Sequence, residues 1–380
     1  MKAADRIKNI KEYYFAGKLR ELRQRIADGE PIINLGIGSP DLPPHPAVID
    51  SLQREAEVSG VHGYQPYKGI PDLREAFSIW NKKKFDIDLD PETEILPLIG
   101  SKEGVMHIAM SFLNPGDVAL VPNPGYPSYS ATSKIAGAES VSYTLSGARP
   151  NFEKIPKELV EKAKIMWINY PHMPTGVHVS ESELAEIVDF AKKHEILLCY
   201  DNPYNQILTK KSVSLFQSDR AKDVGLELHS MSKSFNMAGW RVGFLTGRKE
   251  LLDIVQKFKS NMDSGMFKPV QLAAVEALET GDEHIEAINK VYATRKQLGL
   301  QIMEVLDCKA NKDQSGMFIW AKIPNTWEDA EAFSEYILNK YKVFITPGHV
   351  FGSAGDKYIR LSLCSPEDVL TETLKRIKES

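Results

Sequence analysis

The stretch SMSKSFNMAGWRVGF, residues 230–244, holds one lysine among small hydroxyl side chains and one arginine eight positions later. A lysine amine in such surroundings can attack a carbonyl carbon to form a Schiff base, and a nearby arginine can bind a phosphate. The region is too apolar to be an ordinary charged surface, so we interpret it as a site of covalent chemistry. The residues concerned are Ser230, Ser232, Lys233, Ser234 and Arg241.

A carboxylate and a phenol follow an apolar run nearby in the chain. DNPYNQ places Asp201 directly after ILLCY, with Tyr204 three residues further on. A carboxylate in that position commonly caps the next turn. Taken together with Lys233 and Arg241, Asp201 has a second interpretation, in which it holds the pyridine nitrogen of a cofactor protonated.

GSKEGV is a second candidate anion site. It follows a strand-like run and begins a helical pattern, which puts the Ser101 hydroxyl and the amides of Lys102 and Glu103 at a helix N-terminus. That arrangement suits a phosphate group. The alternative is that Ser101 is an ordinary helix N-cap.

One arginine stands on a predicted strand near the C-terminus. In KYIRLSLC, the apolar residues Ile359, Leu361 and Leu363 alternate with Arg360 and Ser362, so Arg360 points away from the apolar face. A guanidinium can grip a carboxylate through two hydrogen bonds, whereas a lysine offers only a point charge. Such a clamp fits this position, and a surface arginine is the alternative.

The elements that position these residues form a βαβ rhythm. Strand-like runs at 94–99, 118–122, 165–170, 196–200 and 226–230 alternate with helical patterns, which predicts a mostly parallel sheet covered by helices. Ligands bind at the carboxyl ends of strands in such sheets, where Asp201 and the lysine segment fall. One helix is especially clear: Ser180 and Glu183 fit a capping box, followed by an apolar face of Leu184, Ile187, Val188 and Ala191.

Beyond residue 285 the pattern changes to a long charged helix and three strand-like runs, SGMFIWAKI, YKVFITPG and KYIRLSLC. We therefore expect a small α+β domain at 286–380 beside a large α/β, cofactor-binding domain at 41–285. Residues 1–40 are expected to pack with the small domain.

Composition excludes several classes of protein. With 42% hydrophobic and 26% charged residues and a net charge of −4, the 380 residues are those of a globular protein with no basic footprint for nucleic acid. Three separated cysteines without CxxC spacing predict neither disulfides nor a metal site. We find no signal sequence or membrane-spanning run, so a cytoplasmic protein is expected.

SMSKSFNMAGWRVG resembles the S-x-S-K…G-x-R-x-G signature of class I/II aminotransferases of fold type I, which use pyridoxal 5'-phosphate. The resemblance covers nearly the whole chain, through NLGIGSPDLP, GYQPYKGIPDLREA, GSKEGV, PNPGYPSY, NYPHMPTG, DNPY and PGHVFGSAGDKYIRLSL in order. It implies a three-layer sheet domain, amino transfer between an amino acid and a 2-oxo acid by a ping-pong mechanism, and a homodimer with shared active sites.

The resemblance also implies roles for single residues. Lys233 would carry the cofactor, Asp201 would pair with its ring nitrogen, Tyr204 would hydrogen-bond its ring hydroxyl, and Tyr126 would stack on the ring. Arg360 would bind the substrate carboxylate, and the Gly38 backbone would lie over the substrate. The remaining cofactor-binding residues are Ser101, Lys102, Glu103, Asn169, Ser230, Ser232, Arg241 and, from a second subunit, Tyr64.

The chain departs from the family pattern at two places. NYPHMPTG has Met173 where the family has an asparagine that donates to the ring hydroxyl, unless His172 or Asn169 supplies the missing donor. The chain most resembles the branch with LL-diaminopimelate aminotransferases, whose Y-x-x-E-Q-G loop has an acidic residue that recognises the distal amino group. Tyr67 stands at that place, which argues against that substrate.

Other activities fit the sequence less well. A pyridoxal phosphate-dependent β-lyase would share every motif and differ only in its products. A ligand-sensing module of a transcriptional regulator would need a DNA-binding domain ahead of it, where only some 30 residues precede INLGIGSPD. A nicotinamide dehydrogenase is not indicated, because GIGSPD breaks the G-x-G-x-x-G pattern.

Overall fold

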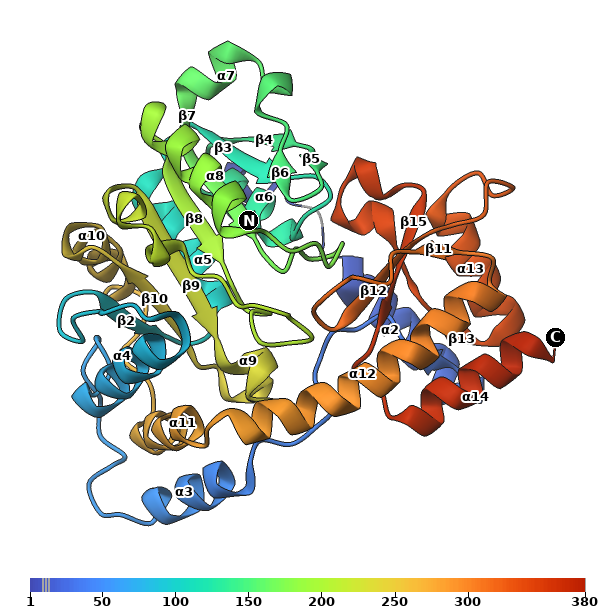
Figure 1. Ribbon diagram of the computed structural model, residues 1–380, viewed down its shortest axis with the longest axis horizontal. Helices are drawn as coiled ribbons and strands as arrows, with labels where there is room; N and C mark the ends of the chain where they lie inside the picture. Colours follow the sequence, from blue (N-terminus) through green and yellow to red (C-terminus); the bar gives the residue numbers. More distant parts are fainter. Residues whose placement is uncertain (9, 11, 13, 380) are drawn as a thin grey trace.

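A seven-stranded, mostly parallel sheet forms the centre of the larger part of the molecule. The computed structural model describes residues 1–379 apart from 9, 11 and 13 (Figure 1). The strand order is β2-β10-β9-β8-β7-β3-β4, with β10 antiparallel to both neighbours and the other pairs parallel. The strands are β2 (Ile95–Leu98), β3 (Val118–Pro122), β4 (Glu139–Tyr143), β7 (Ala163–Asn169), β8 (Leu197–Asp201), β9 (Gly225–Ser230) and β10 (Gly243–Gly247). The five predicted strands are confirmed within two residues at each end.

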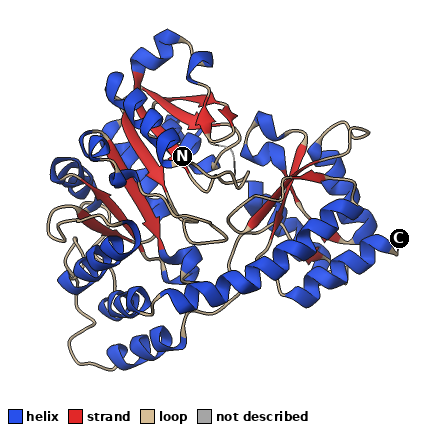
Figure 2. Ribbon diagram, viewed as in Figure 1, coloured by secondary structure: helices blue, strands red, loops and turns tan. Residues whose placement is uncertain are grey.

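Helices cover both faces of this sheet because its strands are apolar on both faces (Figure 2). Along β7, Ile165 and Trp167 pack into one core and Met166 and Ile168 into the other, as the two-residue period of a strand requires. The helices of the first face are α5 (Ser101–Phe112), α6 (Pro127–Ile135) and α10 (Lys249–Lys259), and those of the second are α4 (Pro71–Phe85), α8 (Glu181–Lys193) and α11 (Lys268–Glu279). The expected three-layer arrangement is confirmed.

Helix α8 begins where the sequence predicts it. The Ser180 hydroxyl accepts the Glu183 amide at 3.2 Å, and the Glu183 carboxylate accepts the Ser180 amide at 2.8 Å, which completes the capping box. All four residues of the predicted apolar face are buried. The helix is therefore held against the sheet by the face that its sequence predicts.

A second sheet, of four antiparallel strands in the order β11-β12-β15-β14, lies apart from the first (Figure 1). Its strands are β11 (Lys309–Ala310), β12 (Phe318–Lys322), β14 (Thr346–Pro347) and β15 (Tyr358–Ser362), and the helices beside it are α12 (Asp282–Val305), α13 (Ala330–Tyr341) and α14 (Glu367–Lys378). Helix α12 runs from the large sheet to α14 as one continuous helix. A domain boundary at 285–286 therefore falls in its first turn.

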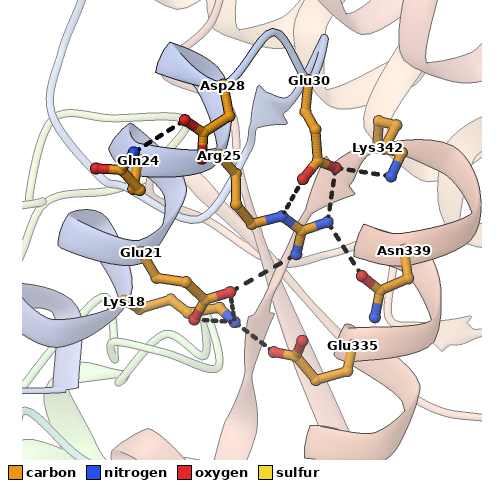
Figure 3. Close-up of polar contacts among 9 residues, drawn as sticks. All are labelled: Lys18, Glu21, Gln24, Arg25, Asp28, Glu30, Glu335, Asn339 and Lys342. Carbon is orange, nitrogen blue, oxygen red and sulfur yellow. Dashed lines mark hydrogen bonds and ion pairs between the residues drawn. The ribbon is translucent and has the colours of Figure 1, made fainter.

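The N-terminal helix α2 (Tyr14–Ala27) is fastened to α13 by a network of charged and polar side chains (Figure 3). Lys18 contacts Glu21 on its own helix and Glu335 on α13. Arg25 contacts Glu30 at 2.8 Å and Asn339 at 3.1 Å. Under these contacts Leu22 is buried against Leu338 and Phe344. Just beyond α2, β1 (Ile33–Asn34) pairs in parallel with β13 (Val343–Phe344).

The remaining elements are short or peripheral. They are α1 (Asp5–Lys8), α3 (Pro46–Ala56), α7 (Lys157–Lys162), α9 (Met231–Ser234), β5 (Leu145–Ser146) and β6 (Arg149–Pro150), with several turns of 3-10 helix. Among the described residues we find no helix that combines the length and the apolar character needed to cross a membrane.

Candidate active site

Three neighbouring strands of the large sheet end in polar residues at the same edge. Asn169, Asp201 and Ser230 are the last residues of β7, β8 and β9, and Asn169 pairs directly with Asp201. A cavity of about 400 Å³ opens at this edge. This is where a parallel sheet presents its ligand site.

All but two of the predicted site residues line this single cavity. They are Gly38, Ser101, Lys102, Tyr126, Asn169, Asp201, Tyr204, Ser230, Ser232, Lys233, Arg241 and Arg360. The chain therefore brings together residues that lie more than 300 positions apart, from Gly38 to Arg360. Glu103 and Tyr64 are not among the lining residues.

One end of the cavity is basic and rich in backbone amides. The Arg241 guanidinium donates to the Ala238 carbonyl at 2.8 Å and lies 3.4 Å from the Ser232 hydroxyl. It also lies so close to Gly100 that a Cβ atom there would be 2.1 Å from Nη2. Gly100, with φ of +81°, is the N-cap of α5 and Ser101 is its first residue, so Ser101 is not the N-cap. An arginine over a helix N-terminus is suited to a phosphate.

The two outlying predictions have different explanations. The Glu103 carboxylate accepts the Ile99 amide at 2.6 Å and lies 3.6 Å from His107, so the side chain is engaged with its neighbours. Only the main-chain amide of Glu103 is then left to bind an anion at the start of α5. Its side chain is a local cap. Tyr64 lies between α3 and α4 and is 94% exposed, so it contributes nothing to the cavity of its own chain.

Asp201 is a buried carboxylate with one oxygen available to a ligand. Its Oδ2 accepts the Tyr129 hydroxyl at 2.6 Å, while its buried Oδ1 has no hydrogen-bond partner among the described residues. Burial raises the pKa of Asp201 to about 6, and the Tyr129 hydrogen bond opposes that rise. Tyr129 is itself held by stacking on Trp167, with ring centroids 4.8 Å apart. A ligand that donates a hydrogen bond to Oδ1 would therefore offset the cost of burying this oxygen.

Met173 faces the cavity, and the two candidate replacements for its missing donor are engaged elsewhere. The Asn169 amide donates to the Asp201 carbonyl at 2.6 Å, and its oxygen accepts the Met173 amide at 2.7 Å. His172 lies 2.8 Å from the Thr175 hydroxyl and does not line the cavity. Burial lowers the pKa of His172 to about 3, so it is neutral. Asn169 and Tyr204 both line the cavity, but the Asn169 amide is engaged with the Asp201 carbonyl, which leaves the Tyr204 hydroxyl as the donor.

Lys233 lies in α9, directly after β9, and its amine donates to the Gly38 carbonyl at 2.5 Å. Burial lowers the pKa of Lys233, and the nearby Arg360 and Arg241 charges lower it further. Each of these effects favours the neutral amine, which is the nucleophilic form. Gly38 must be glycine, because a Cβ atom there would be 2.3 Å from the Phe318 ring.

Arg360 is buried at the other end of the cavity, so the interpretation as a surface arginine is wrong. Its side chain leaves β15 on the face opposite the fully buried Ile359 and Leu361. The guanidinium donates to the Gly36 carbonyl at 2.9 Å and lies 3.9 Å from the Phe318 ring centroid. A carboxylate that enters the cavity would meet this cation out of water.

Several lining residues were not found from the sequence. Tyr129 lies on α6, three positions after the N-cap residue Tyr126, which is a weak signal that both face the same side. Pro203 and Ala238 lie beside predicted site residues, but neither carries a functional group that would single it out. Five others are apolar and come from distant segments, so no local pattern relates them to Lys233. They are Phe15, Leu19, Ile37, Phe318 and Phe351.

Comparisons with known proteins agree with this geometry. Residues 30–377 match the model of the family described as aminotransferase class I and II. The chain is 40% identical to an LL-diaminopimelate aminotransferase of Dehalococcoides mccartyi, over 99% of this chain and 98% of that protein. It is 38% identical to transaminase BacF of Bacillus subtilis, over 99% and 96% of the two chains. The apo structure of BacF superposes with a TM-score of 0.95, over 100% of this chain and 98% of that one.

The buried Asp201 carboxylate predicts a pH-dependent stability. Its pKa in the folded chain, about 6, is above the reference value of 3.8, so the folded state holds the proton more tightly and is destabilised as the pH rises between these values. Asp201→Asn removes this effect. In cofactor-free protein, the stability of the variant relative to wild type should therefore rise by about 1.4 kcal/mol between about pH 5 and pH 8.

Urea unfolding at several pH values measures this difference. Asp50→Asn, which removes an exposed carboxylate from α3, is the matched control and should show a smaller dependence. A difference between Asp201→Asn and wild type that stays constant with pH would contradict the raised pKa.

Proposed function

This chain belongs to the class I and II aminotransferases, and on that premise we propose how its cavity moves an amino group from an amino acid to a 2-oxo acid. Enzymes of the family use pyridoxal 5'-phosphate. The observation that carries the proposal is the Lys233 amine, which shares one cavity with the buried Asp201 carboxylate and the Arg241 guanidinium.

The residues present fit pyridoxal phosphate. Asp201 Oδ1 is a buried acceptor without a partner among the described residues, which suits a protonated ring nitrogen. Arg241 over the N-terminus of α5 suits the phosphate, with Ser101, Lys102, Ser230 and Ser232 around it. Tyr126 and Tyr204 supply an aromatic face and a hydroxyl. These residues would hold the cofactor between the ends of β8 and β9.

The cofactor, when bound, supplies an electron-withdrawing ring that stabilises negative charge at the substrate Cα. Asp201 supports that function because a carboxylate about 3 Å from a pyridinium contributes roughly 5 kcal/mol at an effective dielectric near 20, before desolvation. Lys233 would attach the cofactor and, as a free amine, would move a proton to or from the substrate Cα. Its lowered pKa supports both roles, since each requires the neutral amine for part of the cycle.

Arg360 orients the substrate. Its guanidinium, held by the Gly36 carbonyl and the Phe318 ring, would bind the α-carboxylate through two parallel hydrogen bonds. The 2-oxo acid carries the same carboxylate, so one arginine serves both halves of a ping-pong cycle. A β-lyase would use the same groups and release ammonia and pyruvate, but the relatives named above are aminotransferases, which favours transfer.

A homodimer is part of the proposal. The exposed Tyr64 and Tyr67 lie in one loop, and Met262 and Phe267 are exposed in another. The loops touch, because a Cβ atom at Gly265 would be 2.6 Å from the Gln65 carbonyl. Exposed apolar and aromatic side chains on two touching loops support an interface in which Tyr64 reaches the phosphate end of the neighbouring site. The three cysteines are unpaired and buried, consistent with the proposed cytoplasmic location.

The attachment role of Lys233 has a direct chemical test. Borohydride reduction of the holoenzyme followed by digestion should leave a phosphopyridoxyl group on the peptide that contains Lys233. Lys233→Ala should lose this label and nearly all amino transfer. Lys102→Ala, which changes another lysine of the cavity, should keep the label on Lys233. A wild-type digest labelled at a different lysine would refute the assignment.

Arg360→Lys should separate substrate binding from cofactor binding. Loss of a bidentate contact predicts a KM for amino acids at least about tenfold higher, with the cofactor still bound. Steady-state kinetics and the absorbance of the bound cofactor measure the two effects. Arg376→Lys in α14 is the control. An unchanged KM together with loss of the cofactor would move Arg360 to the cofactor site.

Mixed dimers test the shared site. Tyr64→Ala and Lys233→Ala should each be nearly inactive, because each lacks one part of every site. An equal mixture, unfolded and refolded together, should recover about a quarter of wild-type activity, since half of the dimers are mixed and each has one intact site. Light scattering confirms the oligomer. A mixture no more active than its components would exclude Tyr64 from the neighbouring site.

A further inference from the structure

We propose that the amino acid substrate carries an apolar side chain. This inference rests on the proposed function and specifies the substrate class of the same site. Its basis is an apolar wall in the cavity, formed by Phe15, Leu19, Ile37, Met173, Phe318 and Phe351.

The charged groups of the cavity are all assigned to other tasks. Among the described lining residues the charged side chains are Lys102, Asp201, Lys233, Arg241 and Arg360. In the proposed function, Lys102 and Arg241 would bind the phosphate, Asp201 would pair with the ring nitrogen, Lys233 would hold the cofactor and Arg360 would bind the α-carboxylate. A charge at the far end of a substrate side chain would therefore lose its hydration and find no lining residue of opposite sign that is not already engaged with the cofactor or the α-carboxylate.

The apolar wall adjoins the point where the substrate carboxylate binds. The Arg360 guanidinium lies 3.9 Å from the Phe318 ring centroid, 4.5 Å from that of Phe351 and 5.7 Å from that of Phe15. The Met173 sulfur lies 3.4 Å from Nη1 of the same arginine. A carboxylate bound to Arg360 thus brings the rest of the substrate against rings and a thioether. Each methylene group buried there would raise affinity about fourfold.

The N-terminal helix holds its part of the wall in place. Phe15 and Leu19 are four positions apart on α2 and share one face of it. Lys18 and Arg25 make polar contacts with α13 that fasten the helix (Figure 3). Leu22 adds an apolar contact with Leu338 and Phe344. Phe15 is therefore presented to the cavity by a docked helix and is 8% exposed.

The loop expected to recognise a distal amino group has no acidic residue at the recognising position. Tyr67 occupies the position of the acidic residue, is 45% exposed and is not among the lining residues. Its carbonyl accepts the Lys259 amine at 3.2 Å. This position supplies no carboxylate for a substrate ammonium group.

Single-turnover conversion of the holoenzyme by separate amino acids tests the substrate class. L-phenylalanine, L-leucine and L-methionine should give kcat/KM values at least about tenfold above those of L-aspartate, L-lysine and LL-diaminopimelate. A charged amino acid converted as well as the apolar ones, or better, would overturn the inference and leave the proposed function standing. No conversion by any amino acid, despite a labelled Lys233, would overturn the proposed function and this inference with it.

Binding of unreactive carboxylates gives a readout independent of turnover. Calorimetry on the holoenzyme should find 3-phenylpropanoate and 4-methylpentanoate bound at least about tenfold more tightly than butanedioate and 6-aminohexanoate. Equal affinities, or tighter binding of the charged pair, would contradict the apolar wall.

Variants of α2 test whether this helix supplies the contact with the apolar part of the ligand. Phe15→Ala should weaken 3-phenylpropanoate at least about fivefold and leave butanedioate unchanged, and Leu19→Ala should do the same more weakly. Ile26→Ala, which removes an exposed apolar side chain from the same helix, is the matched control and should change neither. Equal weakening of both ligands by Phe15→Ala and Leu19→Ala would make their role structural and refute the proposal.

Discussion

The buried carboxylate of Asp201 is the constraint on which the site depends. A carboxylate at the end of a central strand, out of water, is unfavourable unless its oxygens are paired. The fold satisfies only one of them, through Tyr129, and it stacks Tyr129 on Trp167 so that this bond is kept. The second oxygen is left for a ligand, and the basic side chains of Lys233, Arg241 and Arg360 line the same cavity. The unpaired oxygen lowers the free energy of unfolding, and it leaves a site that favours a ligand with a cationic ring.

Much of this arrangement can be predicted from the sequence because it depends on residues that lie next to the strands in the chain. Asp201 comes directly after one strand-like run and Lys233 three residues after another. Parallel strands bring their carboxyl ends to one edge, so the proximity of these residues follows from the βαβ pattern. Ser101 follows in the same way, although the cap proved to be Gly100. The roles of these residues came from the family resemblance, since spacing alone left a turn cap and a helix cap as alternatives.

The rest could not be predicted, because it depends on contacts between distant segments. Nothing near Phe15 in the chain indicates that it meets Arg360, which lies more than 300 residues away. The direction of the Glu103 side chain was also undetermined, because a carboxylate in the first turn of a helix can face either a ligand or the preceding backbone. Periodicity tells which face of an element is apolar, and it does not tell which other apolar face will cover it.

The ion pairs that fasten α2 to its neighbours have one more consequence. Lys18 is 8% exposed but its partner Glu335 is 36% exposed, and Arg25 and Glu30 are 20% and 31% exposed, so dissolved ions can screen these attractions. The apolar contact of Leu22 is not screened in this way. Higher ionic strength thus weakens the attachment of the helix that carries Phe15. It has far less effect on the strand ends that carry Asp201 and Lys233. The position of the cavity side formed by α2 therefore depends on salt concentration, whereas the position of the side formed by the strand ends depends on it far less.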